Sequence, residues 1–214
     1  MEVGPFARSL TDELPASFCA ARAHQGTLPP VIVVVSVLGV NCSPSGGGKT
    51  RAAIEAVLGG AAEAGGETRL VELADGDDLA PVIAALAASS AFVFGSPMYR
   101  ATFAAPFKTL MDAVPRGMHG EQSAPLTGRA AVTVATAASD HHFLGPAGMR
   151  DVLVDFFACH VVSPGLYVPA YGYDGHGALA EPFAGRAELL GRALVELARA
   201  IAASAALRAV TPNV

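Results

Sequence analysis

The feature that most constrains this chain is a regular alternation of short apolar runs and helical patterns, which begins at residue 31. The first run, Val31 to Val40, is rich in β-branched residues and continuously apolar, which is typical of a strand buried on both faces of a parallel sheet. The expected strands are 31–40, 67–73, 91–95, 129–136 and 161–169, and the expected helices are 51–66, 79–89, 102–114, 147–158 and 183–206. Because crossovers between parallel strands are right-handed, this order predicts an α/β protein with a doubly wound, five-stranded parallel sheet and helices on both faces.

Composition excludes several classes of protein. Of the 214 residues, 52% are hydrophobic and 15% are charged, which predicts a large core. A net charge of −5 without a basic cluster argues against a nucleic-acid partner. Cys19, Cys42 and Cys159 are scattered, as expected for buried thiols in a reducing cytosol rather than for a disulfide framework. No apolar run reaches the ~18 residues of a membrane span. The N-terminus lacks the apolar segment of a secretory signal, so we expect a cytoplasmic protein without a membrane partner.

Three parts of the chain are distinguished by their patterns. Residues 1–30 have no clear period and contain Pro15, Pro29 and Pro30, so we interpret them as an N-terminal extension. Residues 31–206 form the predicted domain, and residues 207–214 form a C-terminal tail.

The segment NCSPSGGGKT follows the first expected strand and precedes a helix. Loop amides and the N-terminus of the helix together make an anion-binding site. Ser43, Ser45 and Thr50 add hydroxyl donors, and Lys49 adds an ammonium group. The segment therefore predicts a phosphate site.

Three interpretations compete for this loop. A Walker A loop needs G-x-x-x-x-G-K-[ST], and GKT supplies its end, but Ser43 stands where its first glycine belongs. A Walker B strand should end in an aspartate that holds Mg²⁺, whereas AFVFG ends in Gly95. We rank the phosphate of another kind of ligand first, a nucleoside triphosphate second and a plain glycine-rich turn third.

A second loop follows the apolar strand 91–95. It carries Pro97, Met98, Tyr99 and Arg100. Since ligands of open parallel sheets bind at the carboxyl ends of the strands, this loop suits a flat ligand that is partly apolar and partly anionic. Taken alone, the stretch is better interpreted as an ordinary connection between a strand and a helix.

The segment YRATFAAPFKTLMDAVP, residues 99–115, resembles the matching segment of the NAD(P)H-dependent FMN reductases. It is most similar to the branch that supplies reduced flavin to two-component sulfonate monooxygenases. The residues that match the family's sequence pattern, without any insertion or deletion, are Pro97, Tyr99, Arg100, Phe103, Phe107, Lys108, Leu110, Asp112 and Pro115. The similarity extends from about Val31 to about Ala200.

The glycine loop also resembles the flavin-phosphate loop of that family, and this resemblance makes a flavin phosphate the first-ranked ligand of the loop. Ser43, Pro44 and Thr50 match the family pattern. Cys42 replaces the usual glycine, and Ser45 replaces a frequent arginine.

The resemblance implies a flavodoxin-like sheet of order 2-1-3-4-5 that binds FMN at its switch point. It implies FMN and NADPH or NADH as cofactors, with hydride passing from the nicotinamide to flavin N5. No catalytic side chain and no metal are then expected. It further implies a homodimer or homotetramer, and a flavin-dependent monooxygenase as the partner that receives reduced flavin.

The resemblance also assigns residues after the fourth expected strand. Family members have a turn of small residues near the flavin pyrimidine, and residues 136–139 fit this position. His142 matches a histidine of the sulfonate branch, and a role beside the cofactor is weighed evenly with that of an ordinary loop histidine. His141 is interpreted as a histidine that is hydrogen-bonded within the protein or exposed. Phe103 matches a tyrosine that family members carry in a locally widened helix, which predicts a π-bulge near Phe103.

Together these patterns name a set of expected cofactor-binding residues. They are Ser43, Ser45, Lys49, Thr50, Pro97, Met98, Tyr99, Arg100, Thr136, Ala137, Ala138, Ser139 and His142. Tyr171, Tyr173 and His176 in AYGYDGHG either cap a nucleotide or are simple loop residues, and the second interpretation is favoured.

Three other functions stay open at this point. A quinone or azo reductase would use the same fold with an organic acceptor. A flavodoxin-type electron carrier would need no nicotinamide site and would be more acidic than a net charge of −5. A P-loop NTPase is disfavoured by Ser43.

Overall fold

The computed structural model describes residues 34–212, so the predicted extension at residues 1–30 lies outside the described residues. The strands are β1 (Val35–Asn41), β2 (Gly66–Glu72), β3 (Ala91–Tyr99), β4 (Thr102–Phe103), β5 (Ala130–Ala137), β6 (His160–Val161) and β7 (Leu166–Pro169). The sheet order is β2-β1-β3-β5, with β6 and β7 both pairing with β5, and all these pairs are parallel. The predicted flavodoxin-like α/β fold is confirmed.

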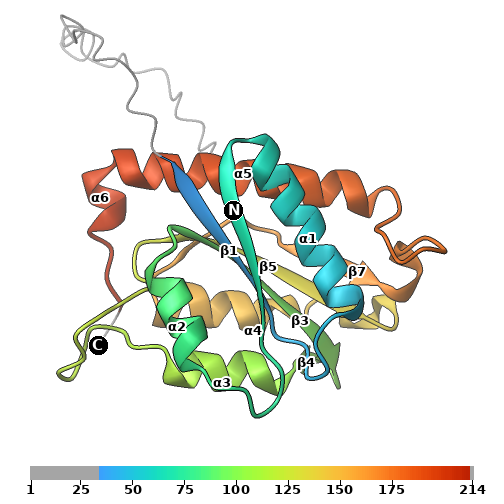
Figure 1. Cartoon of the computed structure of the whole chain (residues 1–214), viewed down its shortest axis with the longest axis horizontal. Coiled ribbons are helices and arrows are strands. Elements are labelled where there is room, and N and C mark those ends of the chain that lie inside the picture. The colour runs from blue at the N-terminus through green and yellow to red at the C-terminus, as the bar shows by residue number, and fades with distance from the viewer. Residues whose placement is uncertain (1–33, 213–214) are drawn as a thin grey trace, which may run out of the picture. The chain divides into compact units, whose positions relative to one another are not determined.

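Helices cover both faces of the sheet (Figure 1). They are α1 (Gly48–Glu63), α2 (Ala80–Ala87), α3 (Ala105–Ala113), α4 (Pro146–Asp151), α5 (Phe183–Ala203) and α6 (Ala205–Arg208), and a π-helical segment, Val152–Phe156, continues α4. One core contains side chains of α1 and α5, and the other contains side chains of α2, α3 and α4. Within residues 34–212, no helix has the length and apolar character needed to cross a membrane.

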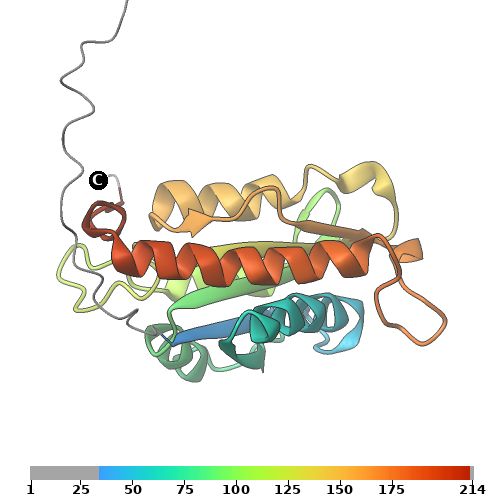
Figure 2. The same cartoon turned by 90° about the horizontal axis from the view of Figure 1, so that it is seen from above.

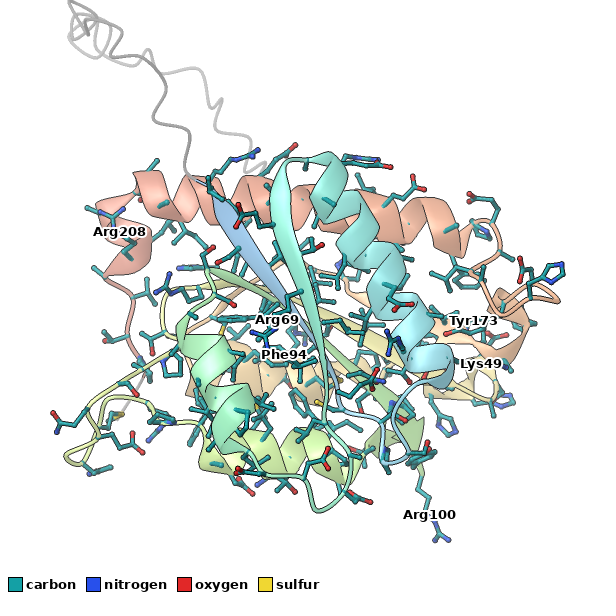
Figure 3. All side chains as sticks on the ribbon, viewed as in Figure 1. Lys49, Arg69, Phe94, Arg100, Tyr173 and Arg208 are labelled. Carbon is teal, nitrogen blue, oxygen red and sulfur yellow. The ribbon has the colours of Figure 1, made fainter. Side chains whose placement is uncertain are left out.

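Strand β3 shows why continuous apolar runs form the central strands. Phe92 and Phe94 are fully buried in the core beneath α2, α3 and α4 (Figure 3 labels Phe94). Ala91 and Val93 are fully buried in the core beneath α1 and α5. Since successive side chains of a strand point to opposite faces, a strand covered on both sides must be apolar at every position.

The loop expected after residue 95 is partly a continuation of β3. Met98 and Tyr99 pair with β4 in an antiparallel hairpin. Arg100 and Ala101 form its turn with φ of 50° and 70°, as in the primed turns that match the twist of a hairpin. Helix α3 therefore begins at Ala105, three residues later than the predicted start at 102.

The predicted π-bulge near Phe103 is wrong. Phe103 lies in β4, and the described π-helical segment is Val152–Phe156. The Phe103 ring instead packs against Phe107, with ring centroids 4.9 Å apart, and a Cβ on Gly148 would lie 3.2 Å from it. The residue thus joins the hairpin to α3 and α4.

The fifth predicted strand, 161–169, is interrupted. β6 pairs with the first residues of β5, and β7 pairs with its last four. Pro164 lies between them and has no N–H to donate to the ladder. Gly165 approaches β5 so closely that a Cβ there would overlap the carbonyl oxygen of Thr133.

Helices α1 and α5 pack through glycines, and Figure 2 shows α5 as the long red helix. A Cβ on Gly60 of α1 would overlap the backbone of Glu188, and a Cβ on Gly191 of α5 would overlap the carbonyl oxygen of Val57. Each helix therefore lies directly on the backbone of the other. By contrast, a Cβ on Gly59 would meet nothing within 4 Å.

This contact predicts opposite effects for two adjacent substitutions. Gly60→Ala should lower the free energy of unfolding by about 1–3 kcal/mol, because the new methyl group would force the helices apart. Gly59→Ala should raise it by about 0.5–1 kcal/mol, since alanine loses less backbone entropy than glycine in a helix. Urea unfolding followed by circular dichroism measures both, and equal effects would contradict the proposed packing.

Candidate functional site

A pocket of about 400 Å³ opens where β1, β3 and β5 end. In the described part of the chain, its lining residues are Ser43, Ser45, Gly46, Gly47, Gly48, Lys49, Thr50, Pro97, Met98, Tyr99, Thr136, Ala137, Ala138 and Ala170. The carboxyl ends of neighbouring parallel strands meet at one edge of a sheet, so three loops that are far apart in sequence converge there. Ten of the expected binding residues thus line one pocket.

The glycine loop forms one end of this pocket. Gly46, Gly47 and Gly48 have φ of 66°, 54° and 66°, a left-handed conformation that residues with a Cβ rarely adopt. Helix α1 begins at Gly48, and its first turn carries no acidic residue. Its first amides have no intrahelical acceptor and stand at the positive end of the helix dipole. With the hydroxyls of Ser43 and Ser45, this end of the pocket suits a phosphate.

One amide of the loop is already used within the protein. The N–H of Gly47 donates to Glu72 Oε2 over 3.1 Å. Asn41 Nδ2 donates to the same oxygen over 2.6 Å and to the Gly47 carbonyl over 3.2 Å. The sequence pattern assigns the loop amides to a phosphate and misses Glu72, which belongs to the neighbouring strand β2.

Lys49 lies against the segment that follows β7 (Figure 3). Its Nζ donates to the carbonyl oxygen of Ala170 over 3.3 Å and lies 5.2 Å from the centre of the Tyr173 ring. The Tyr173 hydroxyl donates to the Lys49 carbonyl over 2.9 Å, and burial raises the pKa of this phenol. The favoured interpretation of Tyr173 as a simple loop residue is therefore incomplete, because it fastens its segment to the start of α1.

The other end of the pocket is mainly apolar. Pro97 and Met98 line it, and Met98 is buried. Tyr99 stands at the rim with 54% of its surface exposed. Ala137 and Ala138 extend this lining from the end of β5.

A buried hydrogen bond joins the two ends of the pocket. Thr50 of α1 and Thr136 of β5 are both buried, and their Oγ1 atoms lie 2.8 Å apart. The pocket thus combines an end rich in hydrogen-bond donors with an apolar end, a combination that fits a ligand with a phosphate at one end and a planar ring at the other.

Three expected residues lie outside the lining of the pocket. Arg100 is in the hairpin turn, and Figure 3 shows its side chain extending away from the rest of the chain. The Ser139 carbonyl accepts a 2.6 Å hydrogen bond from the Tyr167 hydroxyl, and the Ser139 hydroxyl lies 3.2 Å from Nδ1 of His141. His142 is half-buried in the short helical turn Asp140–His142.

This chain is similar to a family of flavin reductases in sequence and to several flavin-related proteins in fold. The family model described as NADPH-dependent FMN reductase matches residues 35–172. An NADH:FMN oxidoreductase, EMOB in its apo form, superposes with a TM-score of 0.65 at 18% identity, covering 82% of this chain and 94% of that chain. A flavodoxin, WrbA-like protein from Agrobacterium tumefaciens gives 0.61 at 20% identity, covering 78% and 99%.

A flavodoxin from the domain Archaea also matches, with a TM-score of 0.58 at 15% identity, covering 77% of this chain and 99% of that chain. At these identities the superpositions show the shared fold. A search of curated protein sequences found no match.

Two cysteines lie among the described residues, and neither is placed for redox chemistry. Cys42 precedes the glycine loop, but it is fully buried, and burial raises the pKa of its thiol. Burial also raises the pKa of Cys159 to about 12. Within residues 34–212, no group of three or more His, Cys, Asp and Glu side chains could hold a metal ion.

Both thiols should therefore stay protonated and inaccessible at pH 8, because only the thiolate attacks a disulfide reagent. In a Cys19→Ser variant, a chromogenic disulfide reagent should release almost no colour from the folded protein. After denaturation in guanidinium, it should react with Cys42 and Cys159. Rapid reaction of one thiol in the folded protein would contradict this burial.

Proposed function

The chain belongs to the NADPH-dependent FMN reductase family, and we propose that it binds FMN in the pocket at the carboxyl ends of β1, β3 and β5 and reduces it with NADPH or NADH. The observation that supports this most directly is the convergence of a glycine loop at a helix N-terminus with the apolar segment Pro97–Tyr99 in one pocket. The hydrogen-bond donors of the glycine loop are complementary to the phosphate of FMN, and the apolar segment is complementary to its ring.

In this proposal, the phosphate lies at the glycine loop. Ser43 and Ser45 donate from their hydroxyls, and the first amides of α1 donate along the helix axis. Thr50 orients the first turn through its hydrogen bond to Thr136. Lys49 lines the pocket and contributes positive charge there, while its contacts with Ala170 and Tyr173 hold the side of the pocket in place.

The ring lies at the apolar end. Pro97 and Met98 exclude water from one side, and the exposed Tyr99 leaves the rim accessible to a nicotinamide. Bound FMN supplies the hydride-accepting chemistry, so that the protein itself needs only to position the reactants. Backbone amides near residues 136–139 and His142 would favour negative charge on the pyrimidine side of the ring. Because Arg100 lies outside the pocket lining and its side chain extends away from the pocket (Figure 3), we assign it to the phosphate of NADPH rather than to the ring.

We extend this proposal to the biological role. The gap-free resemblance of residues 99–115 to the sulfonate branch supports delivery of reduced flavin to a flavin-dependent monooxygenase. The same resemblance supports a homodimer or homotetramer, and the scattered cysteines support a cytoplasmic location.

A nicotinamide oxidation assay tests the reaction. Purified protein should oxidise NADPH or NADH under air at a rate that rises and saturates with added FMN. The fall in nicotinamide absorbance measures this rate. A yellow protein whose rate ignores FMN but responds to quinones or azo dyes would favour a reductase with tightly held flavin. Absence of both flavin binding and nicotinamide oxidation would contradict the proposal.

A substitution in the glycine loop tests the position of the phosphate. Ser45→Ala should raise the dissociation constant for FMN about tenfold, because one hydrogen bond to a charged group is lost. Riboflavin, which has no phosphate, should bind equally to both proteins. Ser123→Ala, in an exposed loop away from the pocket, is the matched control. Flavin fluorescence titration measures all these constants, and an equal loss for riboflavin would argue against phosphate at Ser45.

A further inference from the structure

Glu72 places a carboxylate against the glycine loop from behind. It is the last residue of β2 and lies beside Asn41 in the parallel register of β1 and β2. It does not line the pocket. A Cβ on Gly46 would lie 3.6 Å from Glu72 Oε2, so the glycines leave only backbone between this carboxylate and the pocket.

Three donors hold this carboxylate in place. Asn41 Nδ2 and the Gly47 N–H both donate to Oε2, over 2.6 and 3.1 Å. Arg51 Nη1 lies 3.0 Å from Oε1, but the same guanidinium also donates to Glu55 over 2.8 Å. Since two carboxylates share one arginine, the positive charge of Arg51 does not fully offset the negative charge of Glu72.

The position of Glu72 has two consequences for an anion in the pocket. The Gly47 N–H points at a carboxylate, so it is not available to a phosphate as a donor. The negative charge also repels a phosphate dianion on the other side of the loop, because only the backbone of the glycines separates the two groups. The loop therefore has the shape of a phosphate site but a weaker hold on phosphate than its amides alone would provide.

We propose that Glu72 sets the affinity for the flavin phosphate low enough for FMN to exchange, so that the flavin acts as a substrate that leaves. This inference rests on the proposed function, which places the phosphate of FMN at the glycine loop. Glu72 acts through the loop and is thus a positioning residue. Its charge, rather than its shape, is the part that weakens the site.

Glu72→Gln separates charge from shape. Glutamine keeps an amide oxygen that accepts from Asn41 and Gly47, but it carries no charge. The variant should bind FMN about tenfold more tightly than the wild-type protein at low ionic strength. The gain should shrink as salt is added, because salt screens the repulsion that the substitution removes. Riboflavin should bind both proteins equally.

Two further variants serve as controls. Glu72→Asp keeps the charge and should keep the weak FMN affinity. Glu55→Gln removes the other carboxylate on Arg51 and leaves that guanidinium to Glu72 alone, so it should tighten FMN binding in the same direction as Glu72→Gln but by a smaller factor. Flavin fluorescence titrations give the constants, and circular dichroism verifies that each variant is folded.

The outcomes distinguish this inference from the proposed function. Tighter FMN binding by Glu72→Gln, with riboflavin unchanged, supports the inference. Weaker or unchanged FMN binding by a folded Glu72→Gln protein overturns it and leaves the proposed function intact. If Glu72→Gln does not fold, the Glu72→Ala variant replaces it, with the same expected direction. A wild-type protein that binds neither FMN nor riboflavin overturns the proposed function, and this inference with it.

Discussion

The close approach of α1 to the sheet is the constraint on which the rest of the structure depends. Ile54 of α1 lies over two glycines: a Cβ on Gly39 of β1 would be 2.8 Å from its Cγ2 atom, and a Cβ on Gly95 of β3 would overlap its Cδ1 atom. A side chain at either glycine would force the Ile54 side chain out of its position between the helix and the sheet. Because α1 can lie this low, its N-terminus at Gly48 reaches the edge where β1, β3 and β5 end.

Hydrogen bonds and an ion pair connect the first turn of α1 to other segments around the pocket. Thr50 connects its first turn to β5 through Thr136, and the carbonyl of Lys49 accepts a hydrogen bond from Tyr173. Behind the loop, Arg51 pairs with Glu72 from β2. The first turn of α1 therefore both offers donors to a ligand and joins three separate segments of the chain. A substitution in that turn would therefore change both the hydrogen-bond donors that face the pocket and the shape of the pocket.

Much of the site was predictable because its signals are local. Apolar runs located the strands, and the glycine loop and Pro97–Met98–Tyr99 followed from residues adjacent in sequence. The hairpin at Arg100 was missed because its turn lacks the Asn-Gly pair that usually marks such turns. The predicted bulge at Phe103 failed because the short strand β4 pairs with β3 before the helix begins. The binding roles of the pocket residues stay predictions.

The sequence by itself determined the alternation of strands and helices, the flavodoxin-like class of fold and the position of the glycine loop after the first strand, because each depends on residues close together along the chain. Only the tertiary structure decided which side chains from distant segments reach that loop. Glu72 and Tyr173 are separated from Gly47 and Lys49 by 25 and 124 positions, and no local pattern marks them as partners. Their contacts arise because the parallel register aligns β2 with β1 and the chain after β7 returns to the same edge of the sheet.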